Sequence, residues 1–114
     1  MSRKIVYICS PLRASTREDM QANIDRANAY CAMAARKENA VPLAPHAIFT
    51  QFLDDYDQRD RLLGLQMGLE LLPLCDELWV CGGRISEGMW REIGHAQEVG
   101  VPVVYLDGRG RAEA

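Results

Sequence analysis

The sequence predicts an α/β fold: a doubly wound, three-layer sandwich around a four- or five-stranded parallel sheet of the flavodoxin or Rossmann type. Two observations support this prediction. Apolar runs of strand length alternate along the chain with amphipathic stretches of helix length, and the connections between them are short. Alternation of this kind gives parallel strands joined by right-handed crossovers.

The first strand and helix have clear sequence signals. Residues 4–9 form a β-branched and aromatic run with almost no polar alternation, which is typical of a strand buried on both faces. Ser15 and Glu18 then have the spacing of a capping box, so we expect a helix over residues 16–37.

The middle of the chain predicts an edge strand and a second long helix. Residues 40–44 are a short apolar strand, and Pro42 favours an edge position because it cannot donate to a sheet ladder. A leucine periodicity indicates a helix over residues 60–72. Gly64 and Gly68 stand inside it, where each costs roughly 1 kcal/mol relative to alanine. We therefore expect something to pack or bind closely at these glycines.

The last third repeats the strand–helix–strand pattern. A third strand is expected over residues 76–81, a third helix over 86–99 and a fourth strand over 101–106. Gly100 suits the left-handed position that ends a helix. The polar segment 107–114 is expected to be a loose tail.

Composition sets the broad class of protein. With 114 residues, 48% hydrophobic and 25% charged, the chain is expected to be one domain over residues 1–114. A formal net charge of −3 gives no electrostatic reason to bind a nucleic acid polymer or an anionic membrane. No apolar run reaches bilayer length and no secretory pattern opens the chain, so a cytoplasmic location is expected. The four cysteines lack metal-ligand spacing and are interpreted as small core side chains.

Three segments should meet at one edge of the sheet. Ligands of open parallel sheets bind beyond the carboxyl ends of the strands. That rule brings together residues 7–13, 45–46 and 82–88. We therefore expect a small-molecule site at this edge.

The start of the third helix offers chemistry to that site. Ser86 is a suitable N-cap, and Gly88 allows a ligand to approach the positive end of the helix dipole. Glu92 shares a helix face with Gly88 and Met89, and helical side chains tilt towards the N-terminus. Its carboxylate is therefore expected to face the site, although a solvated helix carboxylate is the simpler interpretation of position alone.

These residues resemble the nucleoside 2-deoxyribosyltransferase superfamily, and particularly its 2′-deoxynucleoside 5′-monophosphate N-glycosidases and small phage and bacterial members. The resemblance covers nearly the whole chain. The first strand ends in Tyr7-Ile-Cys-Ser-Pro-Leu-Arg13, and Ala44-Pro45-His46 is similar to the threonine-glutamate-histidine of the second strand. Ser86-Glu-Gly88 and Glu92-Ile-Gly94-His-Ala96 match the serine-x-glycine and glutamate-x-glycine-x-alanine motifs.

The resemblance implies cleavage or transfer at the N-glycosidic bond of a (deoxy)nucleoside or nucleoside 5′-monophosphate, with no cofactor and no metal. Glu92 would be the nucleophile that forms a glycosyl-enzyme ester, and Tyr7 would position the carboxylate or the sugar. Family members are typically homo-oligomers whose neighbour helps to close the site. The substrate-binding residues expected in this way are Cys9, Ser10, Arg13, His46, Gly82, Ser86, Gly88 and Met89.

The chain departs from the family at one position of the second helix. The enzymes carry an aspartate there, eight residues before the one that opens the third strand, and here it is Gly68. That carboxylate helps to bind the sugar or to protonate the leaving base. Asp54, Asp55 and His46 are the candidates to replace it, and Asp55 is our choice.

A second departure concerns the 5′-group. Glu87 places an acid beside the helix start, where it would repel a phosphate, although Arg13 and Arg84 could offset it. Whether the substrate is a nucleoside or a nucleotide is therefore open, as are the base, the sugar and the acceptor. Trp90 either stacks on the base or packs against a second subunit.

Two functions of other classes are alternatives to an enzyme. The first is a nucleotide-binding or sensing module that kept the pocket and lost the catalytic activity. Gly68, which stands where the enzymes carry an aspartate, suggests this alternative. The second is a flavodoxin-like domain that serves only as an interaction partner. No Gly-x-Gly-x-x-Gly follows the first strand, so a nicotinamide dinucleotide is not indicated.

Overall fold

The computed structural model describes residues 2–106, so the tail expected over 107–114 lies outside the described part. None of the helices in the described part is long and apolar enough to cross a membrane. The elements along the chain are β1 (Lys4–Cys9), α1 (Arg17–Lys37), β2 (Ala40–Leu43), α2 (Pro45–Phe49), α3 (Gln58–Leu71), a 3₁₀ turn η1 (Leu72–Leu74), β3 (Glu77–Val80), α4 (Glu87–Val99) and β4 (Val103–Tyr105).

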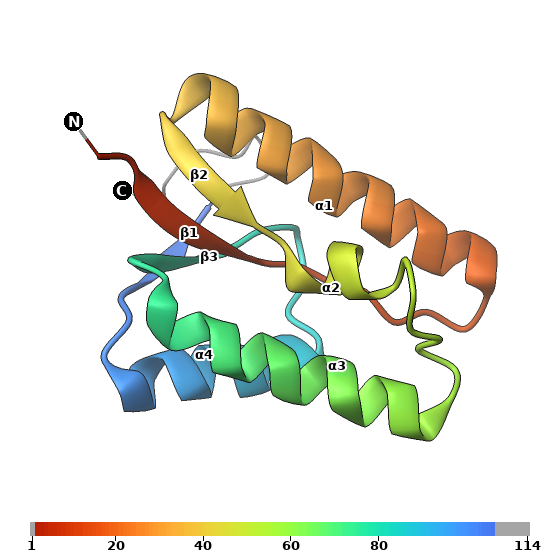
Figure 1. Ribbon diagram of the computed structural model, residues 1–114. Coiled ribbons are helices and arrows are strands. Elements are labelled where there is room, and N and C mark those ends of the chain that lie inside the picture. The colour runs from red at the N-terminus through yellow and green to blue at the C-terminus, as the bar shows by residue number, and fades with distance from the viewer. Residues whose placement is uncertain (1, 107–114) are drawn as a thin grey trace.

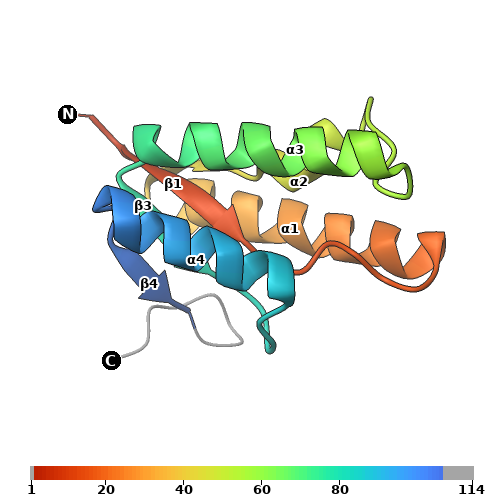
Figure 2. The ribbon, with the colours of Figure 1, turned by 90° about the horizontal axis from the view of Figure 1, so that it is seen from below.

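The four strands form one parallel sheet in the order β2-β1-β3-β4. Helix α1 covers one face, and α3 and α4 lie on the other (Figure 1). Figure 2 shows the same arrangement from below, with α3 and α4 in front of the sheet and α1 behind it. The doubly wound, three-layer α/β fold is thereby confirmed, with four strands in the described part. Strand β2, which contains Pro42, lies at the edge as predicted.

The strand order reverses next to β1. The chain leaves β1 towards β2 through α1, and it returns past β1 to β3 through α2 and α3. The crossovers therefore diverge to opposite faces between β1 and β3, and a crevice opens beyond the carboxyl ends of these two strands. In open α/β sheets this switch point is where ligands bind.

Strand β1 is buried on both faces, as its sequence predicted. Val6 and Ile8 belong to the core under α1, whereas Tyr7 and Cys9 belong to the core under α4. Each of the four is at most 2% exposed. The alternation of the strand thus directs Tyr7 and Cys9 towards the helix that carries Glu92.

The helix starts differ slightly from the sequence prediction. Thr16, not Ser15, caps α1: its hydroxyl accepts a hydrogen bond from the Asp19 amide at 3.1 Å. Helix α3 begins at Gln58 rather than at residue 60, because the Asp57 side chain caps it. Gly100 ends α4 with a φ of 79°, the left-handed conformation that was predicted.

The core also contains Trp79 and three of the four cysteines. Trp79 is 7% exposed and packs under α1. All four cysteines are free thiols, and Cys9, Cys75 and Cys81 are buried. They act as small apolar side chains of the core.

Candidate active site

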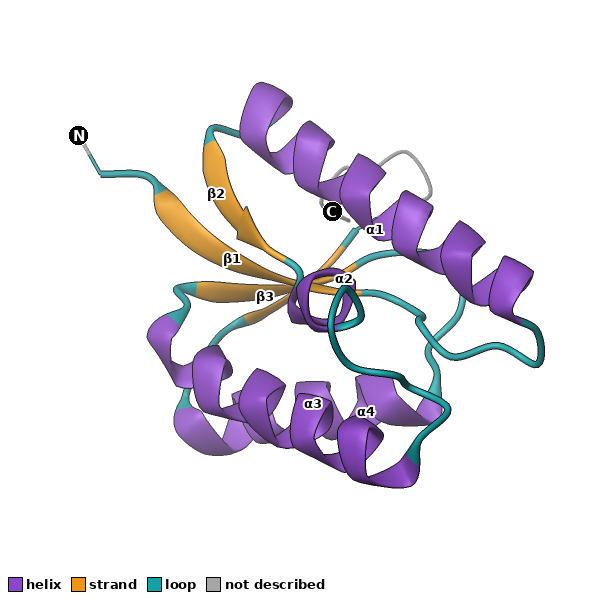
Figure 3. Ribbon diagram, turned by 45° about the vertical axis from the view of Figure 1, so that its right-hand side comes forward, coloured by secondary structure: helices purple, strands orange, loops and turns teal. Residues whose placement is uncertain are grey.

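A cavity of about 620 Å³ lies beyond the carboxyl ends of the strands, between the β1–α1 loop, α2, α3 and the first turns of α4. Figure 3 shows α2 at this end of the sheet, between α1 and α3. The volume is in the range of sites that enclose small organic ligands. Most of the predicted site residues line it, namely Tyr7, Ser10, Arg13, His46, Asp55, Ser86, Gly88, Met89 and Glu92.

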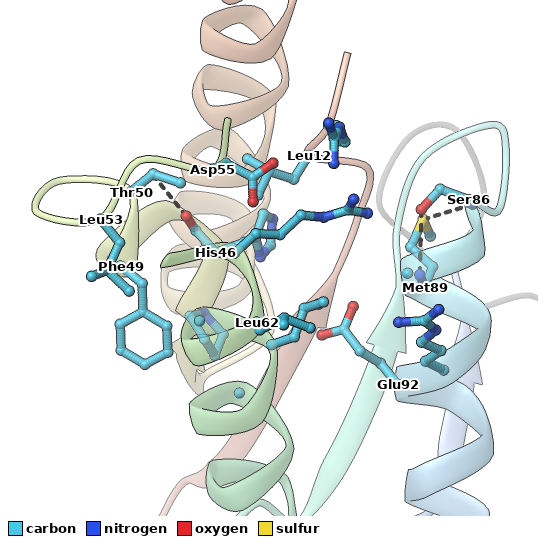
Figure 4. Close-up of a pocket in the computed structure, with 18 of the residues that line it drawn as sticks. Leu12, His46, Phe49, Thr50, Leu53, Asp55, Leu62, Ser86, Met89 and Glu92 are labelled. Atoms are coloured by element: carbon cyan, nitrogen blue, oxygen red, sulfur yellow. Dashed lines mark hydrogen bonds between the residues drawn. The ribbon is translucent and has the colours of Figure 1, made fainter. Parts of the chain in front are cut away.

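Glu92 projects from α4 towards β1 and not into bulk solvent (Figure 4). The Cys9 thiol lies 3.8 Å from its Oε1 and donates towards it. Burial raises the pKa of the Glu92 carboxyl to about 7, and hydrogen bonding from Tyr7 and Cys9 opposes the rise. The interpretation as a solvated helix carboxylate is therefore wrong. Near neutral pH this group exchanges between its acid and its ionised form.

Tyr7 connects the Glu92 carboxylate to α3. Its side chain is 2% exposed, and both burial and the neighbouring Glu92 raise the pKa of the phenol. A Cβ added at Gly68 would lie 3.0 Å from the Tyr7 hydroxyl, which is tighter than most Cβ contacts, so the phenol would have to move by a few tenths of an ångström. Gly68 is therefore the position of close packing that its presence inside a helix predicted. At Gly64 a Cβ would meet only Leu53, at an ordinary 3.8 Å.

The space next to Gly68 is thus taken by Tyr7. An aspartate at this position would have to displace the phenol or hydrogen-bond to it in a different arrangement.

Asp55 enters the cavity from the loop between α2 and α3 (Figure 4). Its Oδ2 atom is buried and has no hydrogen-bond partner among residues 2–106. Burial raises the pKa of the Asp55 carboxyl, although the nearby Arg61 and Arg13 lower it. A carboxyl group without donors retains its proton more readily than a solvated one. Asp54, by contrast, is exposed and lies 3.6 Å from the Arg17 guanidinium.

His46 forms a polar pair with Ser10 at the cavity wall. The Ser10 hydroxyl lies 3.0 Å from the His46 Nε2 atom. Burial lowers the pKa of the His46 imidazole to about 4, so the ring is neutral at pH 7. It can orient Ser10 or hydrogen-bond to a ligand, but it offers neither a positive charge nor an acidic proton at that pH.

The start of α4 is capped as predicted. The Ser86 hydroxyl accepts from the Met89 amide at 3.3 Å, and the Ser86 amide donates to the Met89 sulfur at 3.4 Å. The Met89 amide therefore already has a hydrogen-bond partner. Of the two residues predicted to bind a ligand here, Gly88 and Met89, only Gly88 has an amide that is open to a ligand.

The positive charges at the cavity differ from those expected. Arg84 does not line it, whereas Arg61 and Arg91 do, together with Arg13. Arg91 lies 3.4 Å from the Glu87 carboxylate one turn earlier, so the acid beside the helix start has a partner of its own. The i,i+4 spacing of Glu87 and Arg91 was a signal that could have identified this arginine.

Two predicted binding residues lie outside the cavity lining. Cys9 is fully buried and reaches the site only through its contact with Glu92. Gly82 lines a separate cavity of about 150 Å³, together with Arg84. Its φ of +101° and its closeness to Tyr30 and Pro11 give it a structural role in the turn after β3.

The fold and the site define a flavodoxin-like α/β protein with an acidic side chain enclosed at the topological switch point. A family model described as a domain of unknown function, DUF7768, matches residues 4–106, and the chain belongs to this family. No curated protein matches the chain.

Among solved structures, the chain is similar to a 2-deoxyribosyltransferase from the psychrotolerant bacterium Bacillus psychrosaccharolyticus, described as a biocatalyst for nucleoside synthesis. The TM-score is 0.62 at 15% sequence identity, over 90% of this chain and 71% of that one. At this identity the similarity establishes the fold that the sequence motifs implied.

The substitution Glu92→Gln should stabilise the protein at alkaline pH. A carboxyl whose pKa is about 7 in the folded state and 4.5 as a free group makes the fold lose stability as pH rises between these values. Above pH 8 the variant should gain up to about 3 kcal/mol in free energy of unfolding, and near pH 4 it should gain almost nothing. Urea denaturation at both pH values measures this. Glu70→Gln, an exposed change on α3, is the matched control, and a gain that does not depend on pH would contradict the assignment.

The substitutions Gly68→Ala and Gly64→Ala should have opposite signs. At Gly64 a methyl group has room, so the better helix propensity of alanine should stabilise by up to about 1 kcal/mol. At Gly68 the methyl group must displace the buried Tyr7 hydroxyl, and overpacking costs about 1–3 kcal/mol. Chemical denaturation compares the two variants. Tyr7→Phe should relieve the loss in the Gly68→Ala background; equal effects at both glycines would argue against the close contact.

Proposed function

We propose that this protein cleaves or transfers the N-glycosidic bond of a (deoxy)nucleoside or nucleoside 5′-monophosphate, with Glu92 as the nucleophile. One observation carries the proposal: the Glu92 carboxylate is enclosed next to Tyr7 in a ligand-sized cavity at the switch point of the sheet. The family motifs around Glu92 agree with it. The cytoplasm, where the thiols stay reduced, is the compartment we expect.

The reaction would take two steps. A Glu92 carboxylate oxygen bonds to the anomeric carbon while the carbon–nitrogen bond breaks. The electron pair of the broken bond leaves with the base. Asp55 would donate a proton to the departing base nitrogen, and the burial that raises the pKa of its carboxyl supports this role. Water or a second base then attacks the anomeric carbon and releases Glu92. Tyr7 and Cys9 hydrogen-bond to the carboxylate and thereby favour its reactive, ionised form.

The cavity walls suit the two ends of such a substrate. Apolar side chains of α2, α3 and the loop between them offer a surface for a flat base, among them Phe49, Leu53 and Leu65. The start of α4 would hold the 5′-oxygen through the Ser86–Gly88 turn. Arg91 lies at the same end and could compensate the charge of a 5′-phosphate.

A panel of deoxynucleosides, ribonucleosides and their 5′-monophosphates tests the proposal by release of free base. Wild-type protein should release base from at least one compound, and Glu92→Gln should abolish release. Asp55→Asn should lower kcat by about a hundredfold or more, as loss of a general acid does. The kcat/KM value should rise with pH up to about 7, where the Glu92 carboxyl becomes ionised. Equal release by wild type and Glu92→Gln would end the proposal.

Gly68 favours one alternative, a binding or sensing module that lacks the chemistry, because α3 carries no acid at this position. Such a protein should show a thermal shift with nucleotides, no base release, and little sensitivity of that shift to Glu92→Gln. The same compound panel therefore separates the two functions.

We also propose that the protein is a homo-oligomer. Trp90 is 56% exposed and does not line the cavity, so a contact with a second subunit accounts for it better than stacking on the base. Leu62 and Leu63 on α3 are about half exposed as well. Trp90→Arg should lower the molar mass in solution measured by light scattering, whereas Arg59→Ala should leave it unchanged. A monomeric wild type would contradict this.

A further inference from the structure

Two loops without regular structure form one end of the cavity. The β1–α1 loop contributes Leu12 and Arg13, and the α2–α3 loop contributes Thr50, Leu53 and Asp55. Neither loop belongs to the sheet ladder, so side-chain contacts must hold the two in place relative to one another.

Tyr56 supplies such contacts. Its hydroxyl donates a hydrogen bond to the Ala14 carbonyl oxygen at 3.0 Å, across 42 positions of sequence. The Arg17 guanidinium lies 4.6 Å from the centre of its ring, and that of Arg13 lies 5.9 Å from it. Arg17 also lies 3.6 Å from Asp54. We call this set of contacts around Tyr56 the Tyr56 clasp.

Side-chain carboxylates in and next to the α2–α3 loop fix the backbone on either side of Asp55. The Asp54 carboxylate accepts from the Tyr56 amide at 3.0 Å, and the Asp60 carboxylate accepts from the Asp54 amide at 2.9 Å. The Asp55 carboxyl itself has a buried oxygen without a partner in the described part of the chain. Its place in the cavity therefore depends on its neighbours and not on hydrogen bonds of its own.

We propose that Tyr56 is a positioning residue, and that the clasp it forms with the β1–α1 loop holds the Asp55 carboxyl inside the cavity. The proposal rests on the proposed function for its catalytic consequence. If the clasp opens, the α2–α3 loop is no longer tied to the β1–α1 loop, and water reaches Asp55. The charged groups that face Asp55 are Arg61 on α3, Arg13 on the β1–α1 loop and Asp54 beside it.

Opening the clasp should change the chemical step more than substrate binding. Hydration of the buried Oδ2 atom would lower the pKa of the Asp55 carboxyl, which makes the acid form scarcer at any given pH. The Arg13 guanidinium would also lose its aromatic neighbour. Both changes act on proton donation to the leaving base, and the apolar wall on α3 is left intact.

Two substitutions of Tyr56 should lower kcat to different extents. Tyr56→Phe removes the hydrogen bond to Ala14 and keeps the ring, whereas Tyr56→Leu removes both. We expect kcat for base release to fall severalfold in Tyr56→Phe and about tenfold to a hundredfold in Tyr56→Leu, with KM changed less than threefold. The alkaline limb of the kcat profile should move to lower pH. Tyr105→Phe, on β4 and outside both cavities, is the control for loss of a phenol hydroxyl.

A double-variant cycle separates positioning from general loosening. In the Asp55→Asn background Tyr56→Leu should lower kcat by less than twofold, because the group it positions is already gone. Effects that multiply in the double variant would overturn the proposal, and so would a kcat within twofold of wild type in Tyr56→Leu.

A measurement without turnover keeps this test independent of the proposed function. The Asp55 carboxyl can be titrated by carbon-detected NMR in the ligand-free protein. Its pKa should fall towards the ordinary aspartate value in Tyr56→Leu and stay raised in Tyr105→Phe. An unchanged pKa of Asp55 in Tyr56→Leu would overturn the clasp, whereas absence of base release by wild type would overturn only the proposed function.

Discussion

The contact between the Tyr7 hydroxyl and the Glu92 carboxylate joins the three parts of the structure that build the site. Tyr7 is fixed by β1, the central strand next to the switch point, and Glu92 by α4, which follows β3. The third part is α3, whose close approach to the phenol is eased by the glycine at position 68. Placing a carboxylate in such an enclosure is unfavourable for the fold. Proteins retain such groups mainly where they serve a function.

The two carboxyl groups of the cavity are set apart by their partners. Burial raises the pKa of the Glu92 carboxyl to about 7, and hydrogen bonds from the Tyr7 hydroxyl and the Cys9 thiol limit that rise. Asp55 has a buried oxygen with no donor in the described part of the chain, and burial raises the pKa of its carboxyl against the opposing effect of Arg61 and Arg13. Different surroundings of two carboxyls are how acid and nucleophile are assigned in glycosyl transfer. His46 is neutral at pH 7 and does not compete for the acid role.

The sequence predicted those features that depend on local pattern. Alternating strands and helices determine the fold, Pro42 determines an edge strand, and the motif around Ser86 determines a cap; the structure confirms all three. A sequence pattern cannot choose between two adjacent residues that both fit the same signal. Ser15 and Thr16 both have hydroxyls that can cap a helix, and in the structure it is Thr16 that accepts from the Asp19 amide.

Features that depend on the direction of long side chains or of loops were beyond prediction. Arg84 and Arg61 both follow glycine-rich or polar loops in sequence, yet only Arg61 reaches the cavity. Gly82 precedes the α4 start by a few residues and still faces the other cavity, because the turn after β3 carries it away. Contacts such as that of Tyr56 with Ala14 leave no trace in local sequence, since the partners are 42 positions apart.

Gly68 and the Tyr56 clasp both bear on where an acidic side chain can be held in this site. An acid on α3 would be held by the helix backbone itself, whereas an acid on the α2–α3 loop has no regular structure to orient it. A loop acid therefore needs outside support, which the Ala14 carbonyl, the Arg17 guanidinium and the Asp54 carboxylate supply around Tyr56. With Gly68 the helix can approach Tyr7 closely, and the site then relies on loop packing to place its second carboxyl. Under the proposed function, the nucleophile Glu92 would thus be placed by a helix and the acid Asp55 by a loop that Tyr56 supports.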